Sequence, residues 1–153
     1  MDFSFAETYL PMFFNGIKLT LIISVISIIL GTIVGVLVYF LKTSRLAFGK
    51  IYPLRVVAFG FIETMRGTPV LLQVLVAYVL VSMSPNSSNL PSNMVALIAS
   101  ISAISLNSSV YIAEIVRAGI QSVPRGQMEA ARSLGMPHLM AMREIIMPQA
   151  IKN

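Results

Sequence analysis

The sequence predicts an all-α, polytopic membrane protein with three transmembrane helices. Of its 153 residues, 56% are hydrophobic and only 11% are charged, whereas a soluble domain carries about 25% charged residues. The mean hydropathy is +0.83. Uncharged apolar runs recur along the chain, and about 20 such residues are enough to cross a bilayer. We therefore expect spans at about 19–41, 56–83 and 94–115.

The N-terminal residues 1–16 mix aromatic and aliphatic side chains with Asp2 and Glu7. This composition favours a short helix that lies in the membrane interface. We do not expect a signal peptide here, because the start is acidic and no small-residue cleavage site follows the apolar stretch.

The first span is predicted by the uncharged run from Leu19 to Leu41, which Lys18 and Lys42 bracket. Gly31 and Gly35 within it form a G-x-x-x-G pattern, which lets a second helix approach closely. The pattern fits a packing face inside the protein and the general tolerance of membrane helices for glycine equally well. A basic loop at residues 42–55 follows.

The second span is less regular. Its uncharged part, Val70 to Met83, is too short to cross a bilayer alone, and extension back to Val56 includes Glu63 and Arg66. These two charges lie three apart on one helix face, where they can pair or reach the interface. Since Thr68-Pro69 disfavours regular helix, we expect a kink at residues 67–69. The candidates for an inner gate or packing surface are Glu63, Arg66, Gly67 and Pro69, with interfacial anchoring of the two charges as the alternative.

The third span begins at Met94 and is rich in serine. Serine hydroxyls bond back to their own helix and need no special role. An amide that faces lipid is costly, so Asn107 needs another environment. Ser100, Asn107, Tyr111 and Glu114 fall near one helix face. That face could line a pathway, and the candidate pathway residues are Asn107, Tyr111 and Glu114, together with Arg117, which follows Glu114 by three residues.

Positive charge indicates the orientation of the spans. Basic residues populate the loop 42–55 and the segment from Arg117 onward, whereas the loop 84–93 has no charge. The positive-inside rule places the N-terminus and residues 84–93 outside the cell, and the two basic segments inside.

The stretch 126–148 predicts two short amphipathic helices that meet at a corner. Gln127 to Leu134 contains good helix formers, with Leu134 on one stripe with Met128 and Ala131. Gly135 suits a left-handed cap, and Pro137 suits the first turn of a second helix. That helix, His138 to Ile146, carries Leu139, Met142, Ile145 and Ile146 on one side, and Met147-Pro148 ends or kinks it.

This stretch resembles the EAA loop of ABC importer permeases. Glu129-Ala130-Ala131, three residues, Gly135, nine residues, Ile145, one residue, Met147 and Pro148 match that pattern, in which Leu stands at the position of Met147. Arg66 to Pro69 and Glu114 to Ile120 resemble the polar amino-acid importers of the same family. The resemblance covers the whole chain but only the front part of a family member, so we expect a C-terminally truncated permease. The apolar composition disfavours the alternative, a soluble helix-turn-helix.

The resemblance implies the type I importer fold in a bacterial cell membrane. A second permease subunit pairs with the first as a homodimer or heterodimer, ATP-binding cassette subunits dock beneath, and an extracellular or periplasmic binding protein delivers a polar amino acid. The coupling region is about 120–150, and its implied coupling residues are Glu129, Ala130, Ala131, Gly135 and Pro148. The alternative is a truncated chain that docks the ATPase or packs with a partner permease without transporting.

The chain offers little chemistry of its own. It has no cysteine and one histidine, His138, and it lacks a P-loop pattern and a nucleophile–base pair. We therefore expect no enzyme activity and no metal or other cofactor. The net charge of +5 is spread over loops, which suits a membrane surface rather than nucleic acid.

Overall fold

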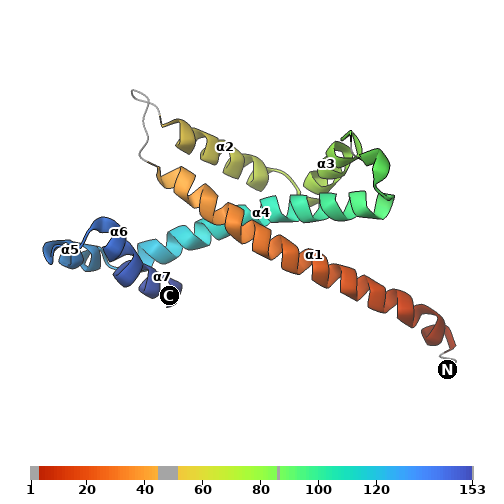
Figure 1. Cartoon of the computed structure of the whole chain (residues 1–153), viewed down its shortest axis with the longest axis horizontal. Helices are drawn as coiled ribbons and strands as arrows, with labels where there is room; N and C mark the ends of the chain where they lie inside the picture. The colour runs from red at the N-terminus through yellow and green to blue at the C-terminus, as the bar shows by residue number, and fades with distance from the viewer. Residues whose placement is uncertain (1–3, 45–51, 86, 153) are drawn as a thin grey trace.

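The computed structural model describes residues 4–44, 52–85 and 87–152, and these are helical apart from short connections. Two long helices, α1 (Ser4–Thr43) and α4 (Ser92–Ser122), cross at the centre of the molecule (Figure 1). Helix α2 (Pro53–Gly67) packs on both, and α3 (Val70–Ser82) packs on α4. Helices α5 (Arg125–Ser133), α6 (His138–Ala141) and α7 (Met147–Lys152) gather at the C-terminal end of α4.

Helix α1 is longer than the predicted first span. Its 40 residues extend about 60 Å, twice the thickness of the hydrocarbon core. The short N-terminal helix expected at 1–16 is not a separate element, because α1 runs without a break from Ser4, and residues 1–3 lie outside the described part. Every residue from Tyr9 to Gly16 is exposed, so this part of α1 projects from the packed helices (Figure 1).

The two glycines of α1 form a packing face against α4. A Cβ atom on Gly35 would lie 2.7 Å from the carbonyl oxygen of Ser109 and 2.8 Å from the Cβ of Ile112. A Cβ on Gly31 would lie 3.1 Å from the carbonyl oxygen of Ser105. The close approach therefore requires glycine at position 35 and leaves little room for a side chain at position 31, and it favours packing over the alternative interpretation of the G-x-x-x-G pattern.

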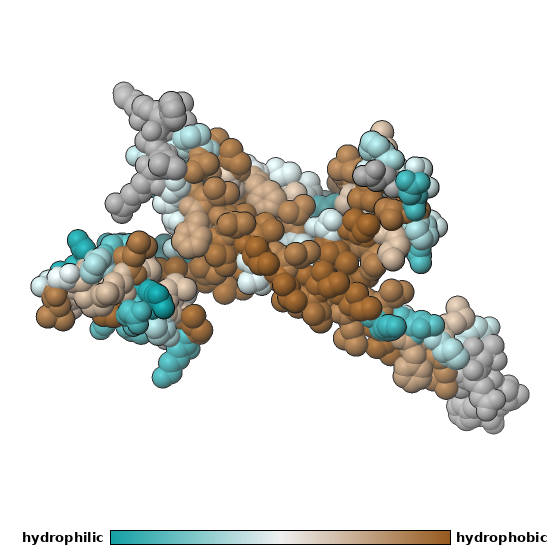
Figure 2. Space-filling model, viewed as in Figure 1, coloured by the Kyte–Doolittle hydropathy of each residue, from teal (hydrophilic) through white to brown (hydrophobic). Residues whose placement is uncertain are grey.

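A small buried cluster lies where α1, α2 and α4 meet. It consists of Val38, Ile62, Val110 and Ala113. Outside this cluster most large apolar side chains of α1 are exposed, and hydrophobic residues cover the middle of the molecule in Figure 2. Hydrophilic residues gather instead over α5 to α7 and the turn after α3. Apolar surface of this extent is stable in lipid or against a partner rather than in water.

The helices suffice for two or three membrane crossings by length and composition. Among the described residues, α1 and α4 are each long and apolar enough to cross, and α2 with α3 adds a third crossing if they act as one span. The bend between α2 and α3 is 111°. It lies at residues 67–69, where the sequence predicts a kink, but it is far sharper than a kink within one straight crossing.

The bend has a local cause. Thr68 is extended, with φ −115° and ψ 139°, because the residue before a proline is driven out of the helical region. Pro69 lacks the N–H group that would continue α2 and precedes the first residue of α3. After α3, a short 3-10 turn, η1 (Ser87–Asn89), leads into α4, which continues past the predicted span end at 115 to Ser122. Half of the predicted loop 42–55, residues 45–51, lies outside the described part.

Candidate functional site

The corner between α5 and α6 is fixed by a glycine cap. Gly135 has φ +83°, a left-handed conformation that glycine adopts without steric strain. The N–H of Met136 donates to the carbonyl of Ala131 and the N–H of Gly135 to that of Arg132, each at 3.1 Å. These two bonds form a Schellman motif. An Arg132 guanidinium nitrogen donates to the carbonyl of Met136 at 2.9 Å, so α5 ends at a fixed point.

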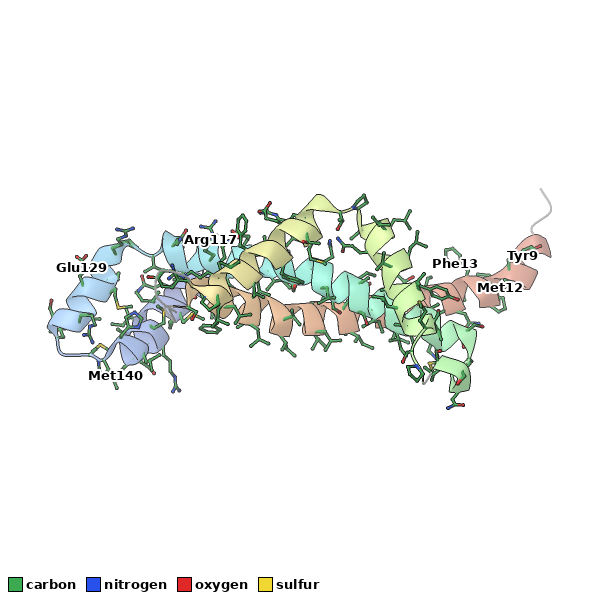
Figure 3. The ribbon with its side chains drawn as sticks, turned by 90° about the horizontal axis from the view of Figure 1, so that it is seen from above. Tyr9, Met12, Phe13, Arg117, Glu129 and Met140 are labelled. Atoms are coloured by element: carbon green, nitrogen blue, oxygen red, sulfur yellow. The ribbon has the colours of Figure 1, made fainter. Side chains whose placement is uncertain are left out.

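The predicted coupling residues divide into an inner and an outer group. Ala131 is 1% exposed, and α5 packs on the following helical turns, in which Ala141 and Ile146 are also buried. Glu129 and Ala130 are exposed, and Figure 3 places Glu129 at the end of the molecule opposite Tyr9. Ala131 thus holds the corner together, whereas Glu129 and Ala130 present its outer surface.

Two leucines of the predicted apolar stripes are exposed at the corner. Leu134 is 84% exposed and Leu139 is 82% exposed, whereas Ala131 and Ile146 of the same stripes are buried. Leu134 is the C-cap of α5, so the left-handed residue after it turns the chain away from the stripe. Leu139 precedes a π-helical turn, which changes the phase of the second helix. With Met140, which is 52% exposed, the leucines form an apolar tip on the corner.

The second predicted helix contains a π-helical turn, η2 (Met142–Ile146). The N–H of Met147 donates to the carbonyl of Met142, one residue further back than in an α-helix. Pro148 follows directly and has no N–H to offer to the carbonyl of Glu144. The helix therefore does not end at Met147-Pro148. It accommodates the proline in a wider turn and continues as α7.

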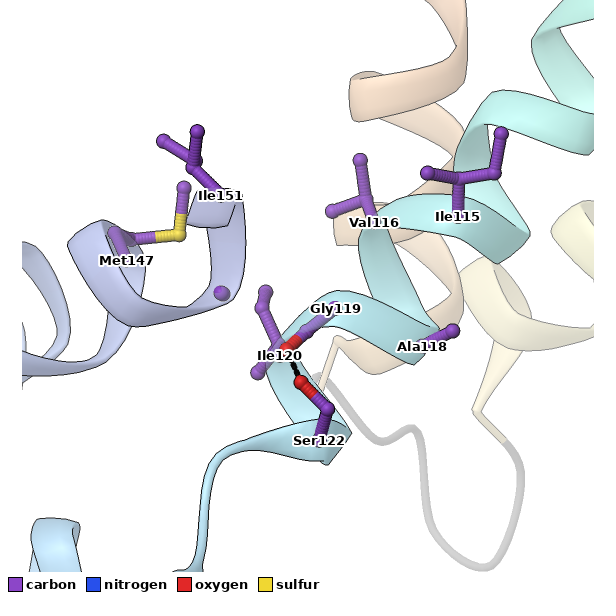
Figure 4. Close-up of a pocket in the computed structure, with 9 residues that line it drawn as sticks. Ile115, Val116, Ala118, Gly119, Ile120, Ser122, Met147 and Ile151 are labelled. Atoms are coloured by element: carbon purple, nitrogen blue, oxygen red, sulfur yellow. Dashed lines mark hydrogen bonds between the residues drawn. The ribbon is translucent and has the colours of Figure 1, made fainter. Parts of the chain in front are cut away.

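Helix α7 joins the corner to α4. A Cβ atom on Gly119 would lie 2.9 Å from the carbonyl oxygen of Ala150, so the two helices touch backbone to backbone. An apolar pocket of about 520 Å³ lies beside this contact, with Val116 and Ile120 of α4 and Met147 and Ile151 of α7 on its walls (Figure 4). The corner is thus attached to the C-terminal end of α4 through a close glycine contact.

The four predicted pathway residues lie in three different environments, because Glu114 and Arg117 share one. Asn107 donates from Nδ2 to Oε1 of Gln73 in α3 at 3.1 Å, and Tyr111 is 52% exposed. Glu114 forms an ion cluster: Lys42 Nζ lies 2.5 Å from Oε1, and Arg117 Nε lies 2.7 Å from Oε2. The sequence analysis missed Gln73 and the pairing of Lys42. The available signal for Gln73 was a single amide within the apolar run 70–82.

The charges near the bend are not paired with each other. Glu63 and Arg66 are both exposed, and no ion pair joins them among the described residues. Gly67 ends α2, and Pro69 is the N-cap of α3. His138 begins α6 and is exposed. Within the described residues no group of three or more His, Cys, Asp or Glu side chains could hold a metal ion.

Comparison with known proteins identifies relatives of this chain. Residues 44–153 match the family described as binding-protein-dependent transport system inner membrane component. The chain is 35% identical to the arginine transport system permease protein ArtQ of Bacillus subtilis (strain 168), over 100% of this chain and 65% of that protein. It is 38% identical to the octopine transport system permease protein OccM of Rhizobium meliloti, over 96% of this chain and 59% of that protein.

A solved structure has the same fold. It is a crystal structure of an amino acid ABC transporter with histidines, with a TM-score of 0.80 and 42% identity, and the match covers 99% of this chain and 66% of that chain. The chain therefore spans about three fifths to two thirds of the length of the relatives it matches. On this family match, the chain belongs to the family of inner-membrane components of binding-protein-dependent transport systems, and its relatives named above are permeases or transporters of amino acids and related compounds.

Proposed function

We propose that the chain acts as a membrane-spanning permease subunit of an ATP-driven importer for polar amino acids. A separate ATP-binding subunit hydrolyses ATP, and this chain passes the resulting movement to the translocation pathway. The relatives named for arginine and octopine transport support this substrate class. The alternative is that the chain docks the ATPase or a partner permease and transports nothing.

The observation that carries the proposal is the construction of the α5–α6 corner. Its outer surface combines an exposed carboxylate, Glu129, with the apolar tip formed by Leu134, Leu139 and Met140. A Schellman cap and the buried Ala131 hold this surface rigid, and α7 attaches it to α4 at Gly119. An exposed apolar tip on a rigid support suits a groove on a partner, and rigid-body movement of the corner would reach the spans.

Further partners belong to this proposal. We propose pairing with a second permease subunit across the exposed apolar surfaces of α1 and α4, and delivery of substrate by an extracellular or periplasmic binding protein. We place residues 117 onward inside the cell and the N-terminus outside, from the distribution of basic residues. The face of α4 that carries Asn107 and Tyr111 is the candidate pathway. Because the Glu114 carboxylate has two cationic neighbours, we assign it to fastening α1 to α4.

Co-purification with the ATP-binding subunit tests docking. Glu129→Lys reverses an exposed charge on the outer surface of the corner and should abolish co-elution from solubilised membranes. Glu144→Lys is the matched control, because Glu144 is an exposed glutamate on the π-helical turn whose partner is the neighbouring Arg143 at 3.4 Å, and it should co-elute. Absence of co-elution for the unaltered chain would contradict the proposal. Co-elution without ATP-dependent uptake would favour the alternative.

Orientation can be tested separately, because the chain has no cysteine. Ser88→Cys lies in the turn after α3, and Ser133→Cys lies at the end of α5. A membrane-impermeant thiol reagent added to intact cells should label the first and not the second. The reverse pattern would contradict the proposed orientation.

A further inference from the structure

The side chain of Gln73 repairs the break between α2 and α3. In a continuous helix the carbonyl of Met65 would accept from the N–H of residue 69, but residue 69 is proline and has no N–H. The amide nitrogen of Gln73 takes its place and donates to the Met65 carbonyl at 2.9 Å. Its second hydrogen is shared between the carbonyl of Thr68 at 3.1 Å and the hydroxyl of Thr68 at 2.9 Å.

The hydroxyl of Thr68 completes the repair. It donates to the carbonyl of Thr64 at 2.8 Å, another acceptor at the end of α2. Backbone carbonyls at membrane depth have no water to bond with, so a break is tolerated only where other groups satisfy them. The bend between α2 and α3 therefore depends on the amide of Gln73 and on the hydroxyl of Thr68 that it contacts.

The same side chain also reaches α4. Oε1 of Gln73 accepts from Nδ2 of Asn107 at 3.1 Å. One glutamine in the first turns of α3 thus connects the C-terminal end of α2 with the middle of α4. Helix α3 has no buried residue, and an apolar pocket of about 320 Å³ opens between it and α4, next to Leu72 and Leu106. Apolar packing thus holds α3 loosely, and the amide pair is the polar link between the two helices.

Helix α4 contacts both α7, which joins it to the α5–α6 corner, and Gln73 at the bend between α2 and α3. Gly119 contacts α7 and through it the α5–α6 corner, and Asn107 lies twelve residues earlier on the same helix, about 18 Å along its axis. A displacement of the corner that moves α4 as a rigid body reaches the α2–α3 bend through Asn107 and Gln73. The route consists of contacts between described residues and needs no change inside α4.

We propose that Gln73 is the positioning residue of the α2–α3 bend: its amide nitrogen sets the angle of the bend, and its amide oxygen, through Asn107, makes the bend follow α4. The second role rests on the proposed function, in which ATP-driven movement reaches α4 from the corner. The first role is independent of it. The two roles use different atoms of one side chain and can be separated by substitution.

The distance across the bend is the measurement that tests both roles. The chain has no cysteine, so a double variant with Val57→Cys in α2 and Leu80→Cys in α3 places two spin labels at defined sites. Both positions are 65% exposed, which leaves room for the label. The pair is measured by pulsed electron spin resonance in lipid vesicles, for the permease alone and for its complex with the ATP-binding subunit, with and without trapped ATP.

Four variants separate the roles. Gln73→Met removes both functions and should broaden the distance distribution even in the permease alone. Asn107→Leu leaves the carbonyls of the bend satisfied, so the distribution should stay narrow but lose its ATP-dependent shift. Asn107→Gln retains an amide donor and should restore the shift. Ser102→Ala is the control, because Ser102 lines the same pocket but bonds only to the carbonyl of Ile98 in its own helix, and it should behave as the parent.

The two roles of Gln73 would be overturned by different results. An unchanged narrow distribution in Gln73→Met would overturn the role in the bend, and this result does not depend on any partner. An ATP-dependent shift that persists in Asn107→Leu, or is absent from the parent complex, would overturn the link to α4. Failure of the ATP-binding subunit to co-purify would instead contradict the proposed function and leave the result for the permease alone as the test of Gln73.

Discussion

Lys42 at the end of α1 and Glu114 in α4 form a salt bridge of 2.5 Å between Nζ and Oε1, although 72 residues separate them in the sequence. Nε of Arg117 donates to Oε2, the second oxygen of the same carboxylate, at 2.7 Å. The bridge lies at the end of the α1–α4 interface that is close to Gly119 and the coupling corner. It therefore fastens the two crossing helices where α4 receives the contact from α7.

Removal of this bridge should loosen the crossing. In Glu114→Gln, Lys42 and Arg117 remain close to each other without the carboxylate between them. Since the side chains of Lys42 and Glu114 are 33% and 21% exposed, we expect a loss of about 1 kcal/mol in the free energy of unfolding, the upper end for solvent-screened pairs. Thermal unfolding in detergent measures it. The charge-reversed pair Lys42→Glu with Glu114→Lys should recover part of the loss, and no recovery would contradict a direct interaction.

The glycine face of α1 gives a second prediction. Gly35→Ala places a Cβ atom 2.7 Å from the Ser109 carbonyl oxygen, so α1 must move away from α4. We expect a destabilisation of about 1–3 kcal/mol, as for overpacking in a core. Gly60→Ala is the control, since its Cβ would meet nothing within 4 Å and alanine is the better helix former. Equal melting temperatures for the two variants would contradict the packing role.

Pro148 is predicted to cause the π-helical turn. Pro148→Ala restores an N–H that can bond to the carbonyl of Glu144, and the turn should revert to α-helix. An α-helical turn holds one residue fewer than the π-helical turn, so this change would rotate the corner relative to α7 by about 100°, the angle per residue of an α-helix. We expect unchanged or higher thermal stability with weaker co-elution of the ATP-binding subunit. Full co-elution together with a retained π-turn would rule out the proline as its cause.

The apolar tip of the corner should contribute to docking rather than to folding. Leu139 is 82% exposed, so Leu139→Ser should change stability by no more than about 0.5 kcal/mol. If Leu139 is an anchor in the partner's groove, the same change should weaken docking by about 2 kcal/mol or more. Ile146 is the opposite case, because its side chain is only 4% exposed. Ile146→Ser should therefore destabilise the chain. Unimpaired binding by Leu139→Ser would remove the tip from the interface.

Much of this arrangement follows from local signals in the sequence. The uncharged run at 19–41, the Thr68-Pro69 dipeptide and the left-handed Gly135 are each local signals, and the structure has a helix, a bend and a cap at these places. Proline narrows and glycine widens the range of backbone conformations whatever surrounds them, and for this reason both can be read in isolation.

The pairings between distant helices could not be predicted in this way. The bonds of Asn107 to Gln73 and of Glu114 to Lys42 depend on which helices pack together, and periodicity along one helix does not encode that. The exposure of Leu139 depends on the phase shift at the π-helical turn. An α-helical period groups Leu139 with Ile146 on one side and does not distinguish the exposed Leu139 from the buried Ile146.

The central claim is that the corner transmits ATP hydrolysis to transport, and ATP-dependent uptake of a labelled polar amino acid into vesicles tests it most directly. Gly135→Asp forces a side chain into a backbone conformation with φ +83°, at about 1–2 kcal/mol of strain, and should abolish uptake while membrane insertion is retained. Gly126→Asp adds the same charge to the same corner at a glycine with open space around it and no positive φ, and should transport normally. Normal uptake by Gly135→Asp, with insertion equal to the parent, would contradict the account.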